Sequence, residues 1–163
     1  MRLLPKRGAL AGVAGVLTLG AMLLAGCGGG TKEGQFYLTL VNESGKTAVL
    51  QTELADNPQT MERGLSGRTS LPRDAGMLFI ITVRGPGFWM KDTLIPLSVA
   101  FIGDCGEIVA LADMEPQTLD LHSTHRPYKF GLEVNKGWFA QHNIGVGDKV
   151  RIPPPLAPGC PIG

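Results

Sequence analysis

The chain has 163 residues, of which 44% are hydrophobic, and it carries 15 lysines and arginines against 14 aspartates and glutamates. Residues 1–26 contain three of the basic side chains and no acidic one, which leaves 12 basic against 14 acidic side chains in the rest. This balance argues against a nucleic-acid partner, which selects for a basic surface. The 137 residues after position 26 suit one compact domain.

The N-terminal segment has the pattern of a secretion signal. Three basic side chains in residues 1–7 precede an uncharged run rich in glycine, alanine, leucine and valine. That run ends in Leu24-Ala25-Gly26-Cys27, which resembles the bacterial lipobox. The resemblance implies cleavage before Cys27, diacylglycerol on its thiol and acylation of the new amino terminus, and several acyl chains anchor a protein stably. A short transmembrane helix is the alternative, weakened by the many glycines.

The rest of the chain divides by composition. Residues 27–34 are expected to form the lipidated cysteine and a flexible, glycine-rich tether. We expect a single β-rich domain over residues 35–153 and a proline-rich tail over residues 154–163. The domain would then lie on the extracytoplasmic face of the cell membrane or the outer membrane.

The first elements of the domain are a hairpin and a helix. Residues 36–41 alternate in polarity, residues 42–46 have turn chemistry, and residues 47–54 are extended again, which predicts a β-hairpin. An aspartate and an asparagine then precede Pro58, a favoured residue in a first helical turn. We expect a short helix over about residues 58–65.

The most apolar third of the domain follows. Residues 76–81 and 94–102 read as buried strands, and in residues 88–93 between them two adjacent opposite charges follow an indole. The turn at residues 104–106 leads into another apolar run, residues 107–112, which predicts a second hairpin. Charge that close to a core requires a partner or a function.

The C-terminal part supplies the remaining elements. They are a long polar loop (115–127) that is either functional or mobile, a strand (128–134), a helix presenting Trp138 and Phe139 to the core (136–142), and a last strand (149–152). About seven strands and one or two short helices predict a mainly β (α+β) fold. The simplest forms are a small barrel or a strongly curved antiparallel or mixed sheet.

Two cysteines remain once Cys27 is lipidated. Cys105 and Cys160 form an even pair in a compartment outside the reducing cytosol, so they are candidates for a disulfide, and two free thiols are the alternative. Neither has a neighbour at metal-ligand spacing.

The long loop contains the one other group of possible metal ligands. Asp120, His122 and His125 are close together in sequence, but we interpret them as solvated loop residues. We therefore expect no metal and no cofactor.

Several motifs carry a resemblance to a known family. They are Met61-Glu62-Arg63-Gly64-Leu65-Ser66-Gly67-Arg68, Gly76-Met77-Leu78-Phe79, Phe88-Trp89-Met90-Lys91-Asp92-Thr93, Ile95-Pro96-Leu97, Phe101-Ile102 and Leu132-Glu133-Val134. Over about residues 36–152 they resemble the domain-of-unknown-function 192 family. The resemblance implies a small β-rich fold and carries over no catalytic residue. The family usually has an aspartate where this chain has Ser98, which weakens any mechanism that needs a second acid beside Asp92.

The motif segments contain the candidate ligand-binding residues, which are Arg63, Arg68, Trp89, Lys91, Asp92 and Glu133. If the helix packs beside the central strands, these side chains converge on one cleft. An indole beside cationic and acidic groups is typical of a pocket for a polar ligand such as a sugar. The alternative is structural: Arg68 or Lys91 pairs with one of the two acids, and Trp89 lies in the core.

Three functions remain open, and we favour the first. It is a lipid-anchored extracytoplasmic binding or accessory module whose pocket takes a small polar ligand such as a glycan or cell-wall fragment. The second is an envelope enzyme that uses Asp92 or Glu133 as acid or base, which requires a carboxyl pKa near neutrality. The third is a structural or partner-binding envelope protein with a broad exposed apolar patch and a protein partner that the sequence does not identify.

Overall fold

The computed structural model describes residues 35–82 and 87–160, all of which belong to one compact unit, residues 31–163. The predicted signal peptide, Cys27 and the tether lie outside the described residues, as does the end of the proline-rich tail. No helix among the described residues is long and apolar enough to span a bilayer.

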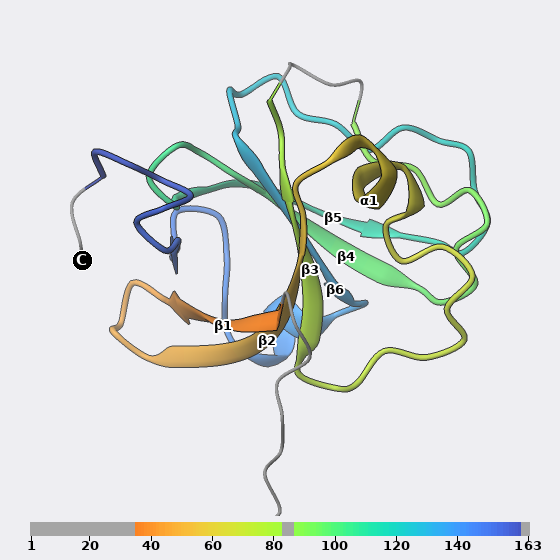
Figure 1. Cartoon of the computed structure of the whole chain (residues 1–163). Helices are drawn as coiled ribbons and strands as arrows, with labels where there is room; N and C mark the ends of the chain where they lie inside the picture. Colours follow the sequence, from red (N-terminus) through yellow and green to blue (C-terminus); the bar gives the residue numbers. More distant parts are fainter. Residues whose placement is uncertain (1–34, 83–86, 161–163) are drawn as a thin grey trace, which may run out of the picture. The chain divides into compact units, whose positions relative to one another are not determined.

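Seven strands form one mixed, curled sheet that resembles half of a barrel, which confirms the predicted mainly β fold (Figure 1). They are β1 (Gln35–Val41), β2 (Thr47–Ala55), β3 (Ala75–Ile80), β4 (Leu97–Ile102), β5 (Ile108–Met114), β6 (Phe130–Asn135) and β7 (Lys149–Arg151). Their order across the sheet is β5-β4-β6-β3-β2-β1-β7. Strand β6, late in the sequence, therefore lies inside the sheet, between β4 and β3.

Local pairings agree with the sequence pattern. Strands β1 and β2 form the first predicted hairpin, and β4 and β5 form the second. Strands β2 and β3 are parallel, and the connection between them carries helix α1 (Pro58–Arg63). A parallel pair requires such a crossover, since a tight turn can only reverse the chain.

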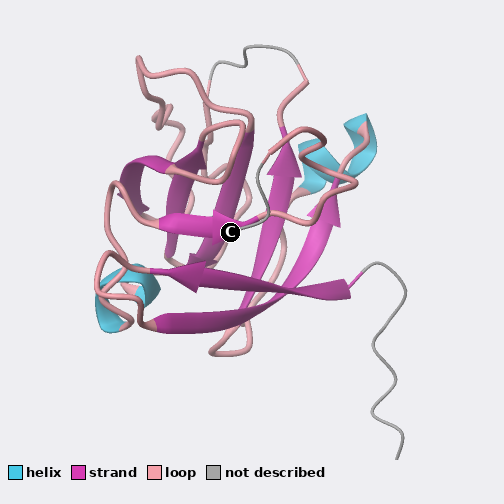
Figure 2. Ribbon diagram, turned by 90° about the vertical axis from the view of Figure 1, so that its left-hand side faces the viewer, coloured by secondary structure: helices cyan, strands magenta, loops and turns pink. Residues whose placement is uncertain are grey.

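Both helices are shorter than expected. The Asn57 side chain caps α1, and the helix ends at Arg63 because Gly64 adopts a left-handed φ of 48°. Helix α2 (Trp138–Gln141) follows Gly137, whose φ is 81°. In Figure 2 the two helices lie far apart, at different ends of the sheet.

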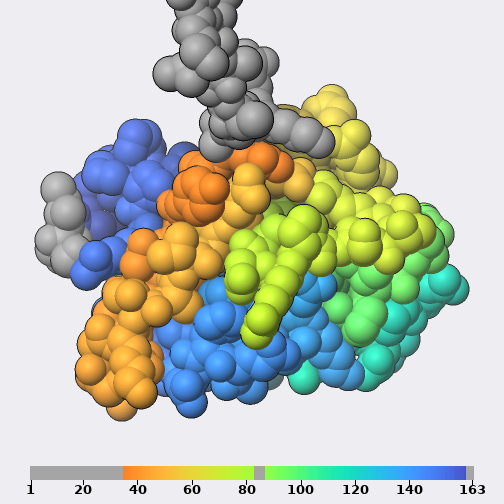
Figure 3. Space-filling view, turned by 90° about the horizontal axis from the view of Figure 1, so that it is seen from below, coloured from red at the N-terminus to blue at the C-terminus, as the bar shows by residue number. Residues whose placement is uncertain are grey.

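Helix α2 presents Trp138 and Phe139 to the core, as predicted, with 1% and 4% of their surfaces exposed. The Trp138 indole donates a hydrogen bond of 2.9 Å to Asp74 just before β3. Figure 3 shows the segment before β3 (yellow-green) lying beside the α2 region (blue) on one surface. This hydrogen bond gives the buried indole N–H an acceptor, so Trp138 can lie in the core without an unsatisfied donor.

The sheet is buried on both faces at its centre. Every residue of β4 is buried, and its side chains alternate between two apolar clusters. One cluster contains Leu132 of β6 and Trp138, and the other contains Phe79 of β3 and Phe101 of β4. The second cluster lies on the sheet face that faces α1, and it underlies the site described below.

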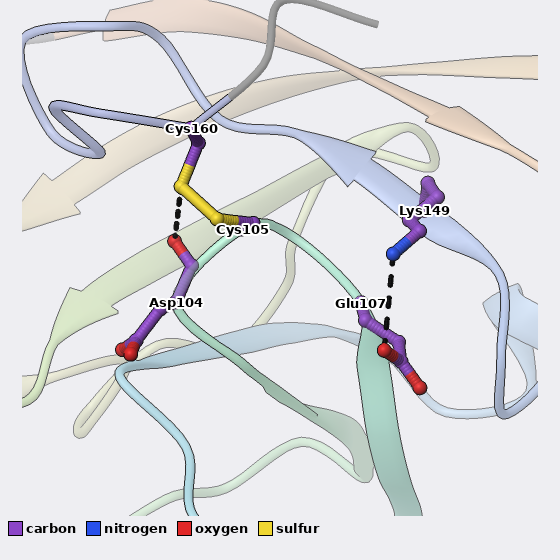
Figure 4. Close-up of a disulfide and its surroundings, with 5 residues drawn as sticks. All are labelled: Asp104, Cys105, Glu107, Lys149 and Cys160. Carbon is purple, nitrogen blue, oxygen red and sulfur yellow. Dashed lines mark hydrogen bonds and ion pairs between the residues drawn. A yellow bond between two sulfur atoms is a disulfide. The ribbon is translucent and has the colours of Figure 1, made fainter.

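The two edge strands meet at one end, at a seam formed by residues 104–108 and 147–150. There Ile108 N–H donates to Asp148 O at 2.9 Å, and Val150 N–H donates to Gly106 O at 2.7 Å. A disulfide between Cys105 and Cys160, with Cα atoms 5.3 Å apart, joins the start of β5 to the tail that follows β7 (Figure 4). The seam pairs backbone groups that open sheet edges would expose.

Candidate functional site

A cavity of about 180 Å³ lies on the α1 side of the sheet. Its lining comes from residues 61–65 at the end of α1, from Phe79 of β3 and Ile81 just after it, and from Tyr128 and Glu133. Residues 87–93, which we call the rim loop, add Gly87, Phe88, Trp89, Lys91 and Thr93. The crossover between β2 and β3 thus brings α1 over the central strands, as the sequence analysis assumed.

Glu133 is placed by the register of β6. It pairs with Met77 of β3 on one side and Val99 of β4 on the other. Its neighbours Leu132 and Val134 point into the cluster on the opposite face, so strand alternation turns Glu133 toward the cavity. Only 5% of its surface is exposed.

The Glu133 carboxyl group has no hydrogen bond or ion pair with any residue in the described ranges. Within those ranges no fully buried side-chain oxygen or nitrogen lacks a partner, so the carboxyl oxygens must reach the cavity. A Cβ placed on Gly64 would lie 4.0 Å from Glu133 Oε2, which puts the end of α1 directly over the acid. Burial raises the pKa of Glu133 from about 4.5 to about 8.

Aromatic rings form the floor of the cavity. The Phe88 ring lies edge-to-face with the rings of Phe79 and Phe101, with ring centres 5.2 Å and 5.7 Å apart. The ring centres of Phe101 and Tyr128 are 5.0 Å apart. A side chain on Gly131 would collide with the outer end of the Phe88 ring, so glycine at that position makes room for the ring against β6. Burial raises the pKa of Tyr128 above its ordinary value.

The mouth of the cavity carries exposed, charged and aromatic groups. Trp89 is 49% exposed, and Lys91 Nζ lies 5.6 Å from the centre of its ring, within cation–π range. Glu62 and Arg63, at the end of α1, are exposed and line the same opening. Trp89 is thus a rim residue and not a core residue.

The long loop supports the rim loop. Phe88 and His122 exchange backbone hydrogen bonds of 2.8 Å, and Met90 N–H donates to Thr118 O at 3.1 Å. Large exposed apolar side chains lie on or near these two loops, namely Trp89, Leu94, Leu119 and Leu121. No cluster of three or more histidine, cysteine, aspartate or glutamate side chains within the described ranges could hold a metal ion.

Four of the six candidate residues line the cavity together: Arg63, Trp89, Lys91 and Glu133. Arg68 lies outside the cavity lining and makes a bidentate ion pair with Glu53 of β2, with both N–O distances at 2.7 Å. That pair raises the pKa of Arg68, chiefly through the hydrogen bond to Glu53.

Asp92 also lies outside the cavity lining. It occupies a turn with φ 55°, and its exposed side chain does not reach the lining. Its backbone oxygen accepts hydrogen bonds from Gly67 N–H at 2.9 Å and Ser66 Oγ at 3.3 Å. The Asp92 backbone therefore ties the rim loop to the turn after α1.

Ser98, where the family resemblance implied an aspartate, lies in β4. It is buried, donates to Asp113 at 2.5 Å and accepts from Gly137 N–H at 2.9 Å. Its contacts are therefore with β5 and the start of α2, and it is not part of the cavity lining.

Sequence reasoning missed Glu62 and Tyr128. Glu62 lies in a quoted motif, directly before Arg63, so the motif itself was a usable signal. Tyr128 gave none, because strict alternation through β6 places it on the face of Phe130, in the other cluster. Tyr128 instead packs against the cluster of Phe79 and Phe101, so the alternation of β6 does not extend back to it.

Comparisons with known proteins identify relatives but no activity. The family model DUF192, described as "Uncharacterized ACR", matches residues 39–152. A crystal structure from Sinorhizobium meliloti 1021, described as a "putative transcription regulator", is 31% identical with a TM-score of 0.69, over 75% of this chain and 96% of that one. A protein of unknown function from Novosphingobium aromaticivorans DSM 12444 is 31% identical with a TM-score of 0.67, over 72% and 85%. No curated protein matches. The chain therefore belongs to the DUF192 family.

Proposed function

We propose that this chain is a lipid-anchored extracytoplasmic binding module whose cavity takes a small polar ligand, such as a sugar or a cell-wall fragment. The observation that carries the proposal is Glu133, a buried carboxyl group that opens into the cavity without a partner in the described ranges. Burying a carboxyl group without a hydrogen bond is costly, and a bound ligand supplies the missing partner.

The cavity sets the size of the ligand. Its volume of about 180 Å³ is below the roughly 300–1,000 Å³ of drug-sized sites. The Phe79 and Phe88 rings offer an apolar floor, while Trp89 and the charged groups stand at the mouth. The ligand is therefore a compact molecule with one polar end that reaches Glu133 and a body that contacts aromatic rings.

The anchoring part of the proposal rests on the sequence of residues 1–27. A basic segment, an apolar run and Leu24-Ala25-Gly26-Cys27 support lipidation at Cys27. Mass spectrometry of the purified protein should find an N-terminus at Cys27 that carries the mass of the acyl chains, and Cys27→Ser should lack that mass. A wild-type protein with an unmodified Cys27 would contradict lipidation.

The binding part is tested by a thermal-shift screen of the purified chain in detergent micelles. We expect a sugar or cell-wall fragment to raise the melting midpoint of the wild type, because a ligand that binds only the folded state stabilises it. The shift should vanish in Trp89→Ala. Asp92→Asn is the matched control, since it alters a rim-loop residue whose side chain lies outside the cavity. Equal shifts in wild type and Trp89→Ala would refute binding in this cavity.

A second candidate is an envelope enzyme with Glu133 as general acid. The pKa of about 8 favours it, because a carboxyl group that stays protonated at neutral pH can deliver a proton. Its other predicted carboxylate, Asp92, does not line the cavity. Turnover of a bound ligand that disappears in Glu133→Gln while binding persists would favour catalysis over binding alone.

A further inference from the structure

Charge is unequally balanced at the mouth of the cavity. Arg63 and Lys91 bring two positive charges, and Glu62 brings one negative charge. None of the three forms an ion pair with a residue in the described ranges, whereas Arg68, Arg126, Lys136 and Lys149 each pair with a glutamate. The mouth therefore keeps one positive charge that the described protein does not neutralise.

Glu133 adds no negative charge at neutral pH. Its neighbours across the sheet are the apolar Met77 and Val99, and no described group donates a hydrogen bond to it. The pKa of about 8 follows from this burial. A protonated carboxyl group offers one O–H donor, which seeks an acceptor on whatever fills the cavity.

These two features select the charge of the ligand. A cationic ligand is repelled by Arg63 and Lys91, and a neutral ligand gains no charge–charge attraction from them. A carboxylate accepts the Glu133 O–H in a charge-assisted hydrogen bond and attracts both cations. Its body then lies on the floor formed by Phe79 and Phe88.

We propose that the cavity binds a small carboxylic acid as its carboxylate, with Arg63 and Lys91 attracting the negative charge and the Glu133 carboxyl group donating a hydrogen bond to it. This inference rests on the proposed binding function and names the chemical class of its ligand. The cavity volume limits the class to compact acids, such as an N-acylated amino acid or a single uronic sugar.

The proposal makes binding dependent on pH. Above pH 8, Glu133 loses its proton and places a second negative charge against the ligand, so affinity falls by about tenfold per pH unit. The other titratable or charged groups around the cavity are Glu62, Arg63, Lys91 and Tyr128. Burial raises the pKa of Tyr128, so the phenol stays neutral while Glu133 titrates.

The test compares matched probes by calorimetry and by NMR of the intact chain in micelles, with carbon-13 in the glutamate carboxyl groups. The probe pairs are N-acetylglycine with N-acetylglycinamide, and glucuronate with glucose. We expect each acid to bind at pH 6 at least about tenfold more tightly than its neutral partner. Bound acid should also raise the pH at which Glu133 titrates.

Three variants and a control locate the effect. Glu133→Gln should still bind the acids, because its amide donates a hydrogen bond, but should lose the fall in affinity above pH 8. Arg63→Gln and Lys91→Gln should each weaken the acids severalfold and leave the neutral probes unchanged. Lys46→Gln, which removes an exposed cation from the β1–β2 turn, should match the wild type.

The outcomes separate the two proposals. Neutral probes that bind as tightly as the acids and shift the Glu133 resonance would overturn the carboxylate inference and leave the binding function intact. Acids that bind with no change at Glu133, or equally well at pH 6 and pH 9, would also overturn it. If no probe of either kind perturbs a cavity resonance while the variants remain folded, the binding function itself is refuted.

Discussion

Two acids in this domain are equally buried and have opposite surroundings. Asp148, in the seam, is 6% exposed, and Glu133, beneath the cavity, is 5% exposed. Asp148 accepts hydrogen bonds from Glu43 N–H at 2.9 Å and Gly145 N–H at 2.6 Å. Glu133 has no such donor among the described residues. The two acids therefore share their burial and differ in their partners, and the missing partner is what supports our proposal for Glu133.

The regions around the two acids differ in the same way. The seam has backbone hydrogen bonds, a disulfide, and the Lys149 ammonium 3.8 Å from Glu107 (Figure 4). The cavity has ring packing and a few backbone bonds between two loops. We expect substitutions at the seam to change stability and substitutions at the cavity to change binding and pH response.

The largest expected effect is the pH dependence of stability that Glu133 imposes. In the unfolded chain it ionises near pH 4.5, and in the folded domain near pH 8. Between these values the folded state holds one proton more, so stability falls as pH rises, by about 1.4 kcal/mol per unit and roughly 4 kcal/mol in all. In urea unfolding, the free energy of unfolding of Glu133→Gln should not fall with pH in this way. At pH 8 it should be larger than that of the wild type.

Glu62→Gln is the control, because it removes an exposed acid at the same cavity and should follow the wild-type curve. Parallel curves for wild type and Glu133→Gln from pH 5 to pH 8 would mean that Glu133 is satisfied as Asp148 is. The comparison between the two acids would then fail.

The disulfide should give the next largest effect. Cys105 and Cys160 are 55 residues apart, and closing a loop of that length stabilises a domain by up to about 4 kcal/mol. The double variant Cys105→Ser with Cys160→Ser should lose that stability in urea unfolding while retaining ligand binding. Equal unfolding midpoints, with two free thiols found by mass spectrometry of native protein, would support the alternative of unpaired cysteines.

Asp148 should give a smaller loss. Asp148→Ala leaves two backbone N–H groups without their acceptor, which costs about 2 kcal/mol. Asp120→Ala, which removes an exposed acid from the long loop, should change stability by less than about 0.5 kcal/mol. If the Asp148 variant unfolded at the same urea concentration as the Asp120 variant, the hydrogen bonds at the seam would carry no net stability.

The sequence predicted those parts of the fold that depend on neighbours in the chain. Both hairpins follow from alternation and turn residues, and α1 starts where Asn57 and Pro58 indicate. Asn57 fulfils its role with a hydrogen bond to Thr60 N–H three residues on. Hairpins and helix caps depend only on residues that are close in sequence, so they can be predicted without knowing the strand order.

The site depends on contacts between distant segments, and it was predicted only in part. Glu133 lies beneath α1 because β6 inserts between β3 and β4, an order that no local pattern specifies. Arg68 was grouped with the cavity, but the parallel pairing of β2 with β3 brings it to Glu53. Asp92 was grouped there too, and a turn with φ 55° directs it elsewhere.

Trp89 should show the smallest change in stability and a large change in binding. It is 49% exposed, and Lys91 Nζ lies 5.6 Å from the centre of its ring, so Trp89→Ala should cost less than about 1 kcal/mol in urea unfolding. Its loss should abolish the ligand-induced thermal shift, because it removes one wall of the cavity mouth. Leu119→Ala is the control, since Leu119 is 67% exposed on the long loop and outside the lining. If Leu119→Ala abolished the ligand-induced thermal shift as Trp89→Ala does, the exposed apolar side chains of the two loops would act together as one binding surface. The contrast between a ligand cavity and a structural seam would then not describe this end of the domain.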